Sequence, residues 1–594
     1  QVTRMNEKIV GIQKWLGINQ AGSDDTSLKL GEASEMRNWR VTQDGALRKR
    51  PGMKAVHTFP GELQGTWCGY VGGEYVQVAA AAGKLWKIGF PATTAASELG
   101  ALADAHTEFF GFREKLYILN GTQYKVFDGY KLSDVTGYVP TVLVGVGADG
   151  SGTELEQINK LSSKRKYRIA TDGKSTVYVC PEDGTLSVSV KNRATGAALA
   201  AGTDYTFAEG KITFTSAPPA GADVYEVEYT VASDDSGAVR AMKFAELYNG
   251  ATDNRVFLYG DGSNKALYSG LDIDGNPTAE YFPDMNALDI GDENTPITAM
   301  IRHYSRLLAF KEDSAYSVQY GTVTNAEGKI LPAFYWTQVN KAIGNTAPGQ
   351  VRLVDNSPYT LFGERVYTWI NNSSYSSILT IDDRQAKRIS DLVWKALQDF
   401  DLRQAYCWDD NDRKEWYCVY GDTAIVHNYG LNVWYLYTNF PVKHFYRVYG
   451  RLLGARGNTL VEISNAFRSD CGEAIDARWE SGNMHFGADF MRKYSAMLWI
   501  GLVPTYAGSM TVTDMTDRKA DFSKKLVFRN SAAFDHANFA HWSFNTNKRP
   551  YMTRLKLNAK KFTSYKLYQT TDDADTSASV TSADIRVRFT GYVR

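Results

Sequence analysis

The stretch Trp416-Tyr417-Cys418-Val419-Tyr420-Gly421-Asp422-Thr423-Ala424-Ile425-Val426 consists of two apolar runs joined by a short polar turn. Runs of this length, rich in aromatic and β-branched residues, predict two strands, and the Gly421-Asp422 turn predicts that they pair as a hairpin. Six more stretches have the same form: 75–88, 115–127, 255–268, 306–318, 359–369 and 452–463. Once one long gap is set aside, the copies start about 35 to 55 residues apart, which is the period typical of β-propeller blades. Because one hairpin cannot cover its own apolar face, we expect the copies to stack around an axis.

The composition is that of a large folded chain. Of its 594 residues, 43% are hydrophobic and 22% charged, which predicts three or four domains with substantial cores. Lysine plus arginine equals aspartate plus glutamate, at 66 each, so no overall positive field favours nucleic acid. No run of 18 apolar residues predicts a membrane span, and the first residues lack the apolar core of a signal peptide.

Changes in the sequence pattern divide the chain into four parts. Residues 1–139 hold an N-terminal hairpin and the first blades, and residues 140–231 change to short strands separated by glycines, typical of an inserted β-sandwich. The remaining blades follow in residues 232–470, with one helix expected over 389–397. Residues 471–594 predict a C-terminal β-sandwich or barrel-like module. The expected fold class is therefore all-β: a β-propeller with an inserted β-sandwich and a C-terminal β module.

The five cysteines are odd in number and lack metal-ligand spacing, which favours a reducing compartment. Cys407 and Cys418 flank a polar hairpin turn, so we expect them to lie near each other across two strands as free thiols.

Catalytic and metal-binding patterns are sparse. The eight histidines form no HExxH or HxH pattern, and a metal site at the closest pair, His536 and His541, would need carboxylate or thiolate partners brought in by the fold. Neither a nucleophile elbow nor a phosphate-binding loop occurs. We therefore expect no catalytic residue, metal or cofactor.

Three acidic clusters could in principle supply oxygen ligands to calcium, namely 272–276, 409–412 and 572–575. None has the full EF-hand spacing, and aspartate and asparagine also form hairpin turns, which is the preferred interpretation. A propeller hydrolase would need two facing carboxylates, and sequence separation does not place such a pair.

The stretch 31–52 contains Asn38-Trp39-Arg40-Val41, the turn Asp44-Gly45 and Arg48-Lys49-Arg50-Pro51-Gly52. Asp44-Gly45 permits a tight turn, and Pro51-Gly52 ends the second strand. The pattern resembles the opening of tail nozzle, or "stabilization", proteins of short-tailed bacteriophages. On this resemblance the candidate interaction residues are Asn38, Trp39, Arg48, Arg50, Pro51 and Gly52.

Two other stretches support the resemblance. Residues 204–224 look like a strand-turn-strand signature of phage virion β-modules, and residues 562–594 are similar to the C-terminal strands of nozzle proteins. The resemblance implies a non-enzymatic virion protein, assembled in the host cytoplasm. It implies a homo-oligomeric ring, expected to be a hexamer, that contacts the portal, the tail adaptor and the tail fibres, with double-stranded DNA passing through it and no membrane insertion.

Two other classes remain open. One is a host-surface binding module in which Tyr375, Trp434 and Tyr435 stack on sugar rings, although sheet packing explains these residues equally well. The other is a propeller polysaccharide hydrolase.

Overall fold

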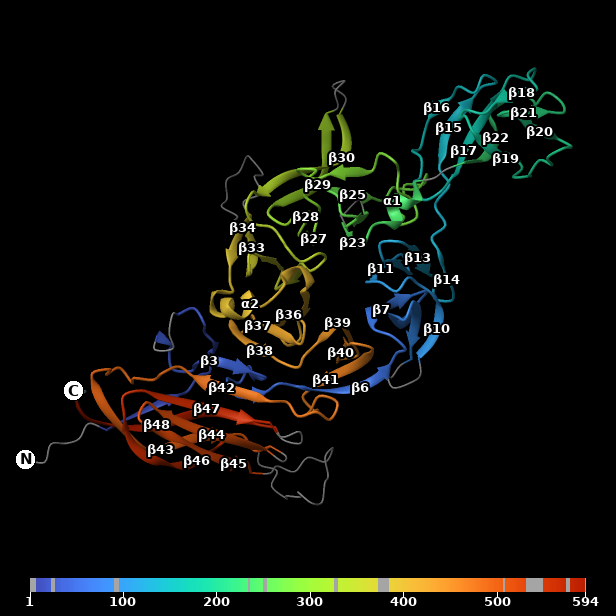
Figure 1. Ribbon diagram of the computed structural model, residues 1–594. Coiled ribbons are helices and arrows are strands. Elements are labelled where there is room, and N and C mark those ends of the chain that lie inside the picture. The colour runs from blue at the N-terminus through green and yellow to red at the C-terminus, as the bar shows by residue number, and fades with distance from the viewer. Residues whose placement is uncertain are drawn as a thin grey trace, which may run out of the picture.

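The computed structural model describes residues 7–22, 27–89, 96–232, 235–248, 254–324, 330–371, 384–505, 508–529, 549–572 and 577–592. Nearly all of its regular structure is β-strand, as expected. Within the described residues, seven four-stranded blades make up a propeller (Figure 1). The blades are β7–β10 (Leu63–Val71, Glu74–Ala81, Lys84–Ile88, Ala96–Ala101), β11–β14 (Glu108–Phe112, Lys115–Leu119, Tyr124–Phe127, Leu132–Asp134), β23–β26 (Phe244–Leu247, Val256–Tyr259, Lys265–Tyr268, Ala287–Asp289), β27–β30 (Ala299–His303, Arg306–Phe310, Ala315–Thr324, Ile330–Asn340), β31–β34 (Arg352–Val354, Ser357–Phe362, Arg365–Asn371, Arg384–Arg388), β35–β38 (Tyr406–Asp410, Glu415–Tyr420, Thr423–Asn428, Val433–Tyr437) and β39–β41 with β6 (Val442–Val448, Arg451–Arg456, Thr459–Ser464, Gly52–Thr58).

Each hairpin predicted from the sequence is the second and third strand of one blade. These strands read as continuous apolar runs because neighbouring blades cover both of their faces. In β8, for example, every residue from Val76 to Ala81 is buried. The first strand of each blade lies nearest the axis, where β7 packs against both β11 and β39. The prediction of a β-propeller is confirmed.

The last blade is completed by a strand from the other end of the chain. β6 pairs antiparallel with β41, with Gly52 opposite Ser464 and Thr58 opposite Thr459. The ring of blades is therefore closed by backbone hydrogen bonds between residues some 400 positions apart, and the N-terminal part of the chain is needed to complete it.

The inserted module has two sheets and its own core. Its strands are β15 (Thr141–Val146), β16 (Thr153–Glu154), β17 (Lys164–Thr171), β18 (Val177–Val179), β19 (Thr185–Asn192), β20 (Tyr205–Ala208), β21 (Lys211–Phe214) and β22 (Gly221–Val231). The sheet β16-β15-β17-β22-β19 faces the sheet β18-β21-β20 across a buried cluster that includes Tyr167, Ile212 and Val227. The insert projects from the propeller rim (Figure 1). It is anchored there by the segment 156–162, where Lys160 N donates to Phe282 O at 2.9 Å and Asp284 N donates to Ile158 O at 3.0 Å.

The C-terminal module is built from strands of both chain ends. Its own strands are β42 (Ala477–Ser481), β43 (Met491–Leu502), β44 (Ser509–Thr516), β45 (Lys519–Val527), β46 (Tyr551–Phe562), β47 (Tyr565–Thr571) and β48 (Ser579–Tyr592). From the N-terminus come β1 (Glu7–Ile12), β2 (Gly17–Ile18), β3 (Glu32–Arg37), β4 (Trp39–Val41) and β5 (Leu47–Lys49). β1 and β5 pair with β48, so these N-terminal strands belong to the C-terminal module rather than to the first blades.

One strand joins the propeller to this module. β3 pairs with β38 of a blade on one side and with β42 on the other, so a single ten-stranded sheet runs from the blade into the module. A continuous hydrophobic core follows the same path, from Trp416 in the blade through Trp39 to Leu498 in the module. The two parts therefore form one body, which Figure 1 shows with the module beneath the propeller.

Helical structure is short. The helix expected over 389–397 corresponds to a 3₁₀ turn at Asp391–Val393 followed by α2 (Trp394–Gln398), and α1 covers Ser236–Arg240. Among the described helices, none is long and apolar enough to cross a membrane.

Candidate functional site: the motif junction and the axial cavity

The residues that carry the nozzle resemblance lie at the junction between the propeller and the C-terminal module. Arg50 donates to both carboxylate oxygens of Asp470, at 2.9 and 2.5 Å, and its Nε donates to Asn38 Oδ1 at 2.8 Å. Asn38 has a φ of 56°, and its Nδ2 donates to Asp476 O at 2.6 Å and to Thr438 Oγ1 at 2.8 Å. Asparagine tolerates this left-handed conformation better than most residues. Together the two side chains tie the start of β6 to a blade end and to the segment that leads into the module.

The close packing at this junction explains the Arg-Pro-Gly sequence. A Cβ on Gly52 would lie 2.4 Å from Ser469 O and 2.9 Å from Phe467 O, so only glycine allows the two backbones to approach this closely. Phe440 and Tyr437 lie under the Arg50 guanidinium, with ring centroids at 5.3 and 5.7 Å.

This arrangement corrects the expectation of an interaction surface. Asn38, Trp39, Arg50, Pro51 and Gly52 are buried, so they hold parts of one chain together and do not face a partner. Of the six predicted residues, only Arg48 is partly exposed.

A cavity of about 850 Å³ opens on the propeller axis, where the first strands of the blades begin. All seven blades contribute to it: among the residues that line it are Gln64, His106, Phe244, Thr298, Gln350, Tyr406 and Lys443. Each lies at or just before the start of the first strand of its blade. The blade ring therefore creates a site that no single blade contains.

Cationic groups surround the mouth of the cavity. Lys243 and Lys443 contribute side chains there, whereas Arg403 and Arg456 are paired with Glu312 at 2.7 Å and Glu473 at 3.1 Å. Glu62 is the carboxylate at the same mouth. The cavity mouth is thus positive overall and suits ligands with acidic or hydroxyl groups.

His444 sits in a β-bulge of β39, where the register with β40 shifts between Lys443 and Tyr446. Its φ of 49° aims the side chain at the cavity, where its ring lies 5.9 Å from that of His106 and 5.3 Å from that of Tyr406. Burial, and then the positive charges of His106 and Lys443, lower the pKa of His444 to about 3. His444 is therefore neutral at pH 7 and can accept or donate a hydrogen bond.

A second charged layer lies two residues further along three of these strands. It consists of Glu108, Glu246 and Arg352, which follow His106, Phe244 and Gln350 with the alternation of a strand. Burial raises the pKa of Glu246 to about 7, and the Glu108 carboxylate adds to the rise while Arg352 and the Arg302 amide oppose it. A carboxyl group with this pKa can hold or release a proton near neutrality.

The sequence did not point to this constellation. Its members come from different blades and are separated by up to several hundred residues, so no local motif contains them. The only local feature of the sequence that could indicate this site is a polar residue in the strand before each apolar hairpin.

The other predicted groups lie apart from the cavity or in turns. The carboxylate of Asp272 accepts the amides of Asp274 and Asn276, as expected of a turn, and Asp573 and Asp575 fall outside the described residues. Among the described residues no cluster of three His, Cys, Asp or Glu could hold a metal ion. His536 and His541 lie outside the described residues.

Two of the three aromatic residues considered for sugar stacking are inaccessible. Trp434 and Tyr435 are buried, and the Trp434 ring stacks on His427 at 4.2 Å, so neither is available to a glycan. Tyr375 lies outside the described residues. The expected proximity of the two cysteines is confirmed: Cys407 and Cys418 are directly opposite each other in β35 and β36. That they are free thiols stays a prediction.

Comparison with known proteins gives structural likenesses only. No family model matches the sequence, and no curated protein matches it. Among solved structures, the chain is similar to the WD40 domain of SCAP from fission yeast, with a TM-score of 0.28 and 8% identity over 70% of this chain and 95% of that one. It is also similar to an exo-β-1,3-galactanase from Phanerochaete chrysosporium, with a TM-score of 0.18 and 8% identity over 82% of this chain and 97% of that one. The class of the protein follows from its own sheet topology, which is that of an all-β propeller protein with two additional β modules.

Proposed function

We propose that this chain is a structural virion protein that forms a homo-oligomeric ring, the tail nozzle beneath the portal and adaptor, through which double-stranded DNA leaves the head. The observation that carries the proposal is the junction of Arg50, Asn38 and Asp470. The residues of the nozzle-like motif are those that make the propeller and the C-terminal module one body. A structural role for the motif residues within the chain is what the proposal draws on.

Two further features support an assembly role. The insert projects from the rim of the propeller, as does the hairpin of β29 and β30, which offers separate surfaces to neighbouring proteins (Figure 1). The formal charge of the chain is zero, which suits a conduit because a strongly cationic lining would retain a polyanion. In this role the chain contacts the adaptor above and tail fibres at its side, in a virion assembled in the host cytoplasm.

Electron cryo-microscopy of the assembled particle tests the proposal. We expect six copies of this chain in a closed ring around the tail axis, each with its seven-bladed propeller recognisable in the map. Peripheral copies on fibres, or one copy at the tail tip, would contradict the nozzle and favour a host-binding role.

A second candidate function is polysaccharide binding or hydrolysis at the axial cavity. The observation that favours it is Glu246, whose pKa of about 7 lies in the range of a proton donor, with a second carboxylate, Glu108, close enough to influence it. Incubation of the protein with host capsule or cell-wall polysaccharide tests this candidate. Sugar release by the wild type that is lost in Glu246→Gln supports hydrolysis, whereas no release removes hydrolysis, and failure to retain the polysaccharide in a pull-down removes binding.

A further inference from the structure

A second open cavity, of about 420 Å³, lies between the hairpin of β4 and β5 and the turn that joins β35 to β36. It is lined by residues 40–44, Arg48, Asp412, Arg413, Glu415 and Asn428. It is separate from the axial cavity, with which it shares no lining residue.

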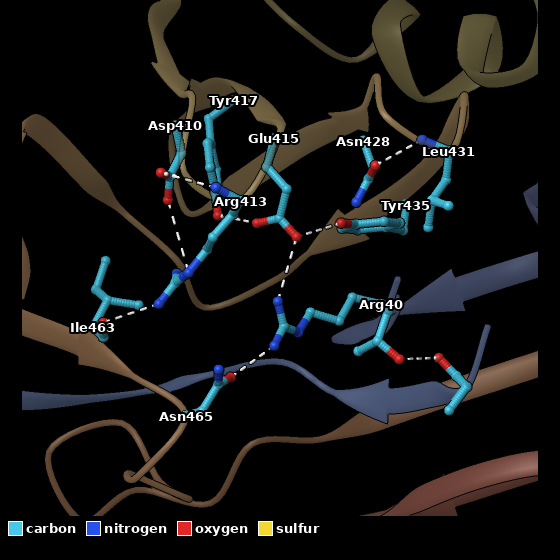
Figure 2. Close-up of polar contacts among 12 residues, drawn as sticks. Arg40, Asp410, Arg413, Glu415, Tyr417, Asn428, Leu431, Tyr435, Ile463 and Asn465 are labelled. Carbon is cyan, nitrogen blue, oxygen red and sulfur yellow. Dashed lines mark hydrogen bonds and ion pairs between the residues drawn. The ribbon is translucent and has the colours of Figure 1, made fainter. Parts of the chain in front are cut away.

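Three arginines converge on this cavity. Arg40 and Arg48 occupy directly opposite positions in the paired strands β4 and β5, so both side chains emerge on the same face. Like charges directly opposite in a sheet are destabilising. Arg413 approaches from the blade, and Figure 2 shows its guanidinium and that of Arg40 on either side of Glu415. Burial works against the charges of Arg40 and Arg413, yet nearby acidic groups, Glu415 among them, raise the pKa of both. The electrostatic cost therefore falls on Arg48, whose pKa is lowered.

Several donors of these arginines have no partner. Arg40 Nη2 donates to Asn465 Oδ1 at 2.7 Å, and Nη1 lies 3.5 Å from Glu415 Oε1, but its buried Nε has no acceptor among the described residues. Arg413 Nη2 donates to Ile463 O at 3.3 Å and its Nε lies 3.7 Å from Asp410 Oδ2, whereas its buried Nη1 likewise has no acceptor among the described residues. In the described part of the chain, the side chain of Arg48 makes no hydrogen bond or ion pair. Other buried donors without acceptors occur in the described residues, such as Nε of Arg37 and of Arg168. This cavity is distinguished by having two of them, on Arg40 and Arg413, among its own lining residues.

The carboxylates that line the cavity are already engaged elsewhere. Glu415 accepts the hydroxyls of Tyr417 and Tyr435, each at 2.6 Å. Asp412 pairs with Arg447 at 3.1 Å, and Asp44 accepts the hydroxyl of Thr42. These three carboxylates equal the three arginines in formal charge, yet they leave the unpartnered donors of Arg40 and Arg413 without acceptors.

The electrostatics of Arg48 favour the binding of an anion. Burial and then the positive charge of Arg40 lower the pKa of Arg48, and only Asp44 opposes this effect. An anion in the cavity would offset both the desolvation and the repulsion.

We propose that this cavity binds a phosphate group, held by Arg40, Arg48 and Arg413. Guanidinium donors reach it from two strands and from a facing turn, which suits the several oxygens of a tetrahedral oxyanion better than the two oxygens of a planar carboxylate. The inference stands independently of the virion role.

Calorimetric titration of the full chain with inorganic phosphate, in phosphate-free buffer near pH 7, tests the site. Replacing Arg48 by Gln should weaken phosphate binding by at least about tenfold, the loss expected for a charge-assisted hydrogen bond. Arg48→Lys keeps the charge but loses the forked donors, so it should bind with intermediate affinity. Lys211→Gln removes an exposed cation of the insert and should leave binding unchanged. Equal affinity in wild type and Arg48→Gln, or no binding by the wild type, would overturn the proposal.

A second variant, at an exposed position, tests the site without the risk that the substitution disturbs folding. Gln43 is exposed at the cavity, so Gln43→Glu should leave the fold intact and weaken binding through repulsion. Unchanged affinity in this variant would count against the site.

A short DNA duplex that displaces bound phosphate would identify the ligand as a backbone phosphate of nucleic acid. A duplex that does not displace it would identify free phosphate or a small ester.

Discussion

Arg50 and Asp470 meet in a bidentate ion pair in which neither side chain has any solvent exposure, although the two residues are 420 positions apart in the sequence. Arg50 lies two residues before the start of β6, the strand that closes the propeller, and Asp470 lies in the segment that leads from the last blade into the C-terminal module. The pair therefore lies where blade closure and the attachment of the module coincide. Arg50 also donates hydrogen bonds to Asn38 Oδ1, Pro51 O and Thr438 O.

Replacing Asp470 by Asn should destabilise the protein strongly, because it leaves the buried Arg50 charge without a counter-ion. We expect a loss of about 3 to 5 kcal/mol, as is typical when one partner of a buried pair is removed. Urea unfolding followed by tryptophan fluorescence measures it. In the control, Asp391→Asn breaks the exposed pair with Arg388 and should cost less than about 1 kcal/mol. Equal effects of the two substitutions would show that the buried pair has no special role.

Gly52→Ala should also destabilise this junction, because the new methyl group would meet the backbone oxygens of Ser469 and Phe467. Overpacking of this kind costs about 1 to 3 kcal/mol. Gly237 provides a matched control, since it lies in α1 and nothing lies within 4 Å of the position of its Cβ. There the same substitution should be neutral or slightly stabilising. A thermal shift of similar size in both variants would contradict the close approach at Gly52.

The sequence predicts the blades well and the junction poorly, for physical reasons. The central hairpins are recognisable because both faces of strands such as β8 and β36 are buried, which leaves long apolar runs. Arg50 gives no such signal. A charged residue is normally exposed, and its partner Asp470 becomes a neighbour only when the ring closes. The sequence therefore singles out the motif Asn38 to Gly52 but predicts a surface role for it, whereas most of its candidate residues are buried.

The axial site was missed for a related reason. His106, Glu246 and His444 are ordinary polar residues in separate strands, and their proximity depends on the arrangement of blades around the axis. Sequence periodicity gives the number of hairpins but not which polar residue of each blade faces the axis.

The insert should fold alone when residues 140–231 are expressed as a separate fragment. Its core residues, among them Tyr167, Ile212 and Val227, contact one another and form a cluster separate from those of the blades. We therefore expect one cooperative thermal transition and protected amides in both sheets by hydrogen exchange. A fragment whose amides exchange at the rate of an unfolded chain would show that the insert depends on the propeller.

The thiols should differ sharply in reactivity. Cys471 is exposed, whereas Cys407 and Cys418 are buried opposite each other, and the hydrogen bond from Cys407, together with burial, raises the pKa of Cys418 well above its usual value. Iodoacetamide should label Cys471 in the folded protein and leave this pair unmodified. Mass spectrometry after denaturation without reductant should then find all five cysteines alkylated. An unlabelled pair with a mass two hydrogens lower would reveal a disulfide instead.

The stability of the propeller should depend on pH through Glu246. Its pKa rises from 4.5 to about 7 on folding, so the folded state binds this proton more tightly than the unfolded state does. The resulting stabilisation is complete below pH 4.5 and is lost as the pH rises to about 7, a change of at most about 3 kcal/mol. His444 acts in the opposite direction, because its lowered pKa favours folding above pH 6.5.

Glu246→Gln isolates the effect of this one carboxyl group, since His444 contributes equally to variant and wild type. The variant should gain stability relative to the wild type as the pH is raised from 4.5 to 7, because it keeps a neutral side chain throughout. Urea unfolding at several pH values across this range measures the difference. Glu62→Gln, at the exposed mouth of the same cavity, should show no such trend. A stability difference between Glu246→Gln and wild type that stays constant with pH would mean that Glu246 is ionised in the folded protein and cannot serve as a proton donor near neutrality.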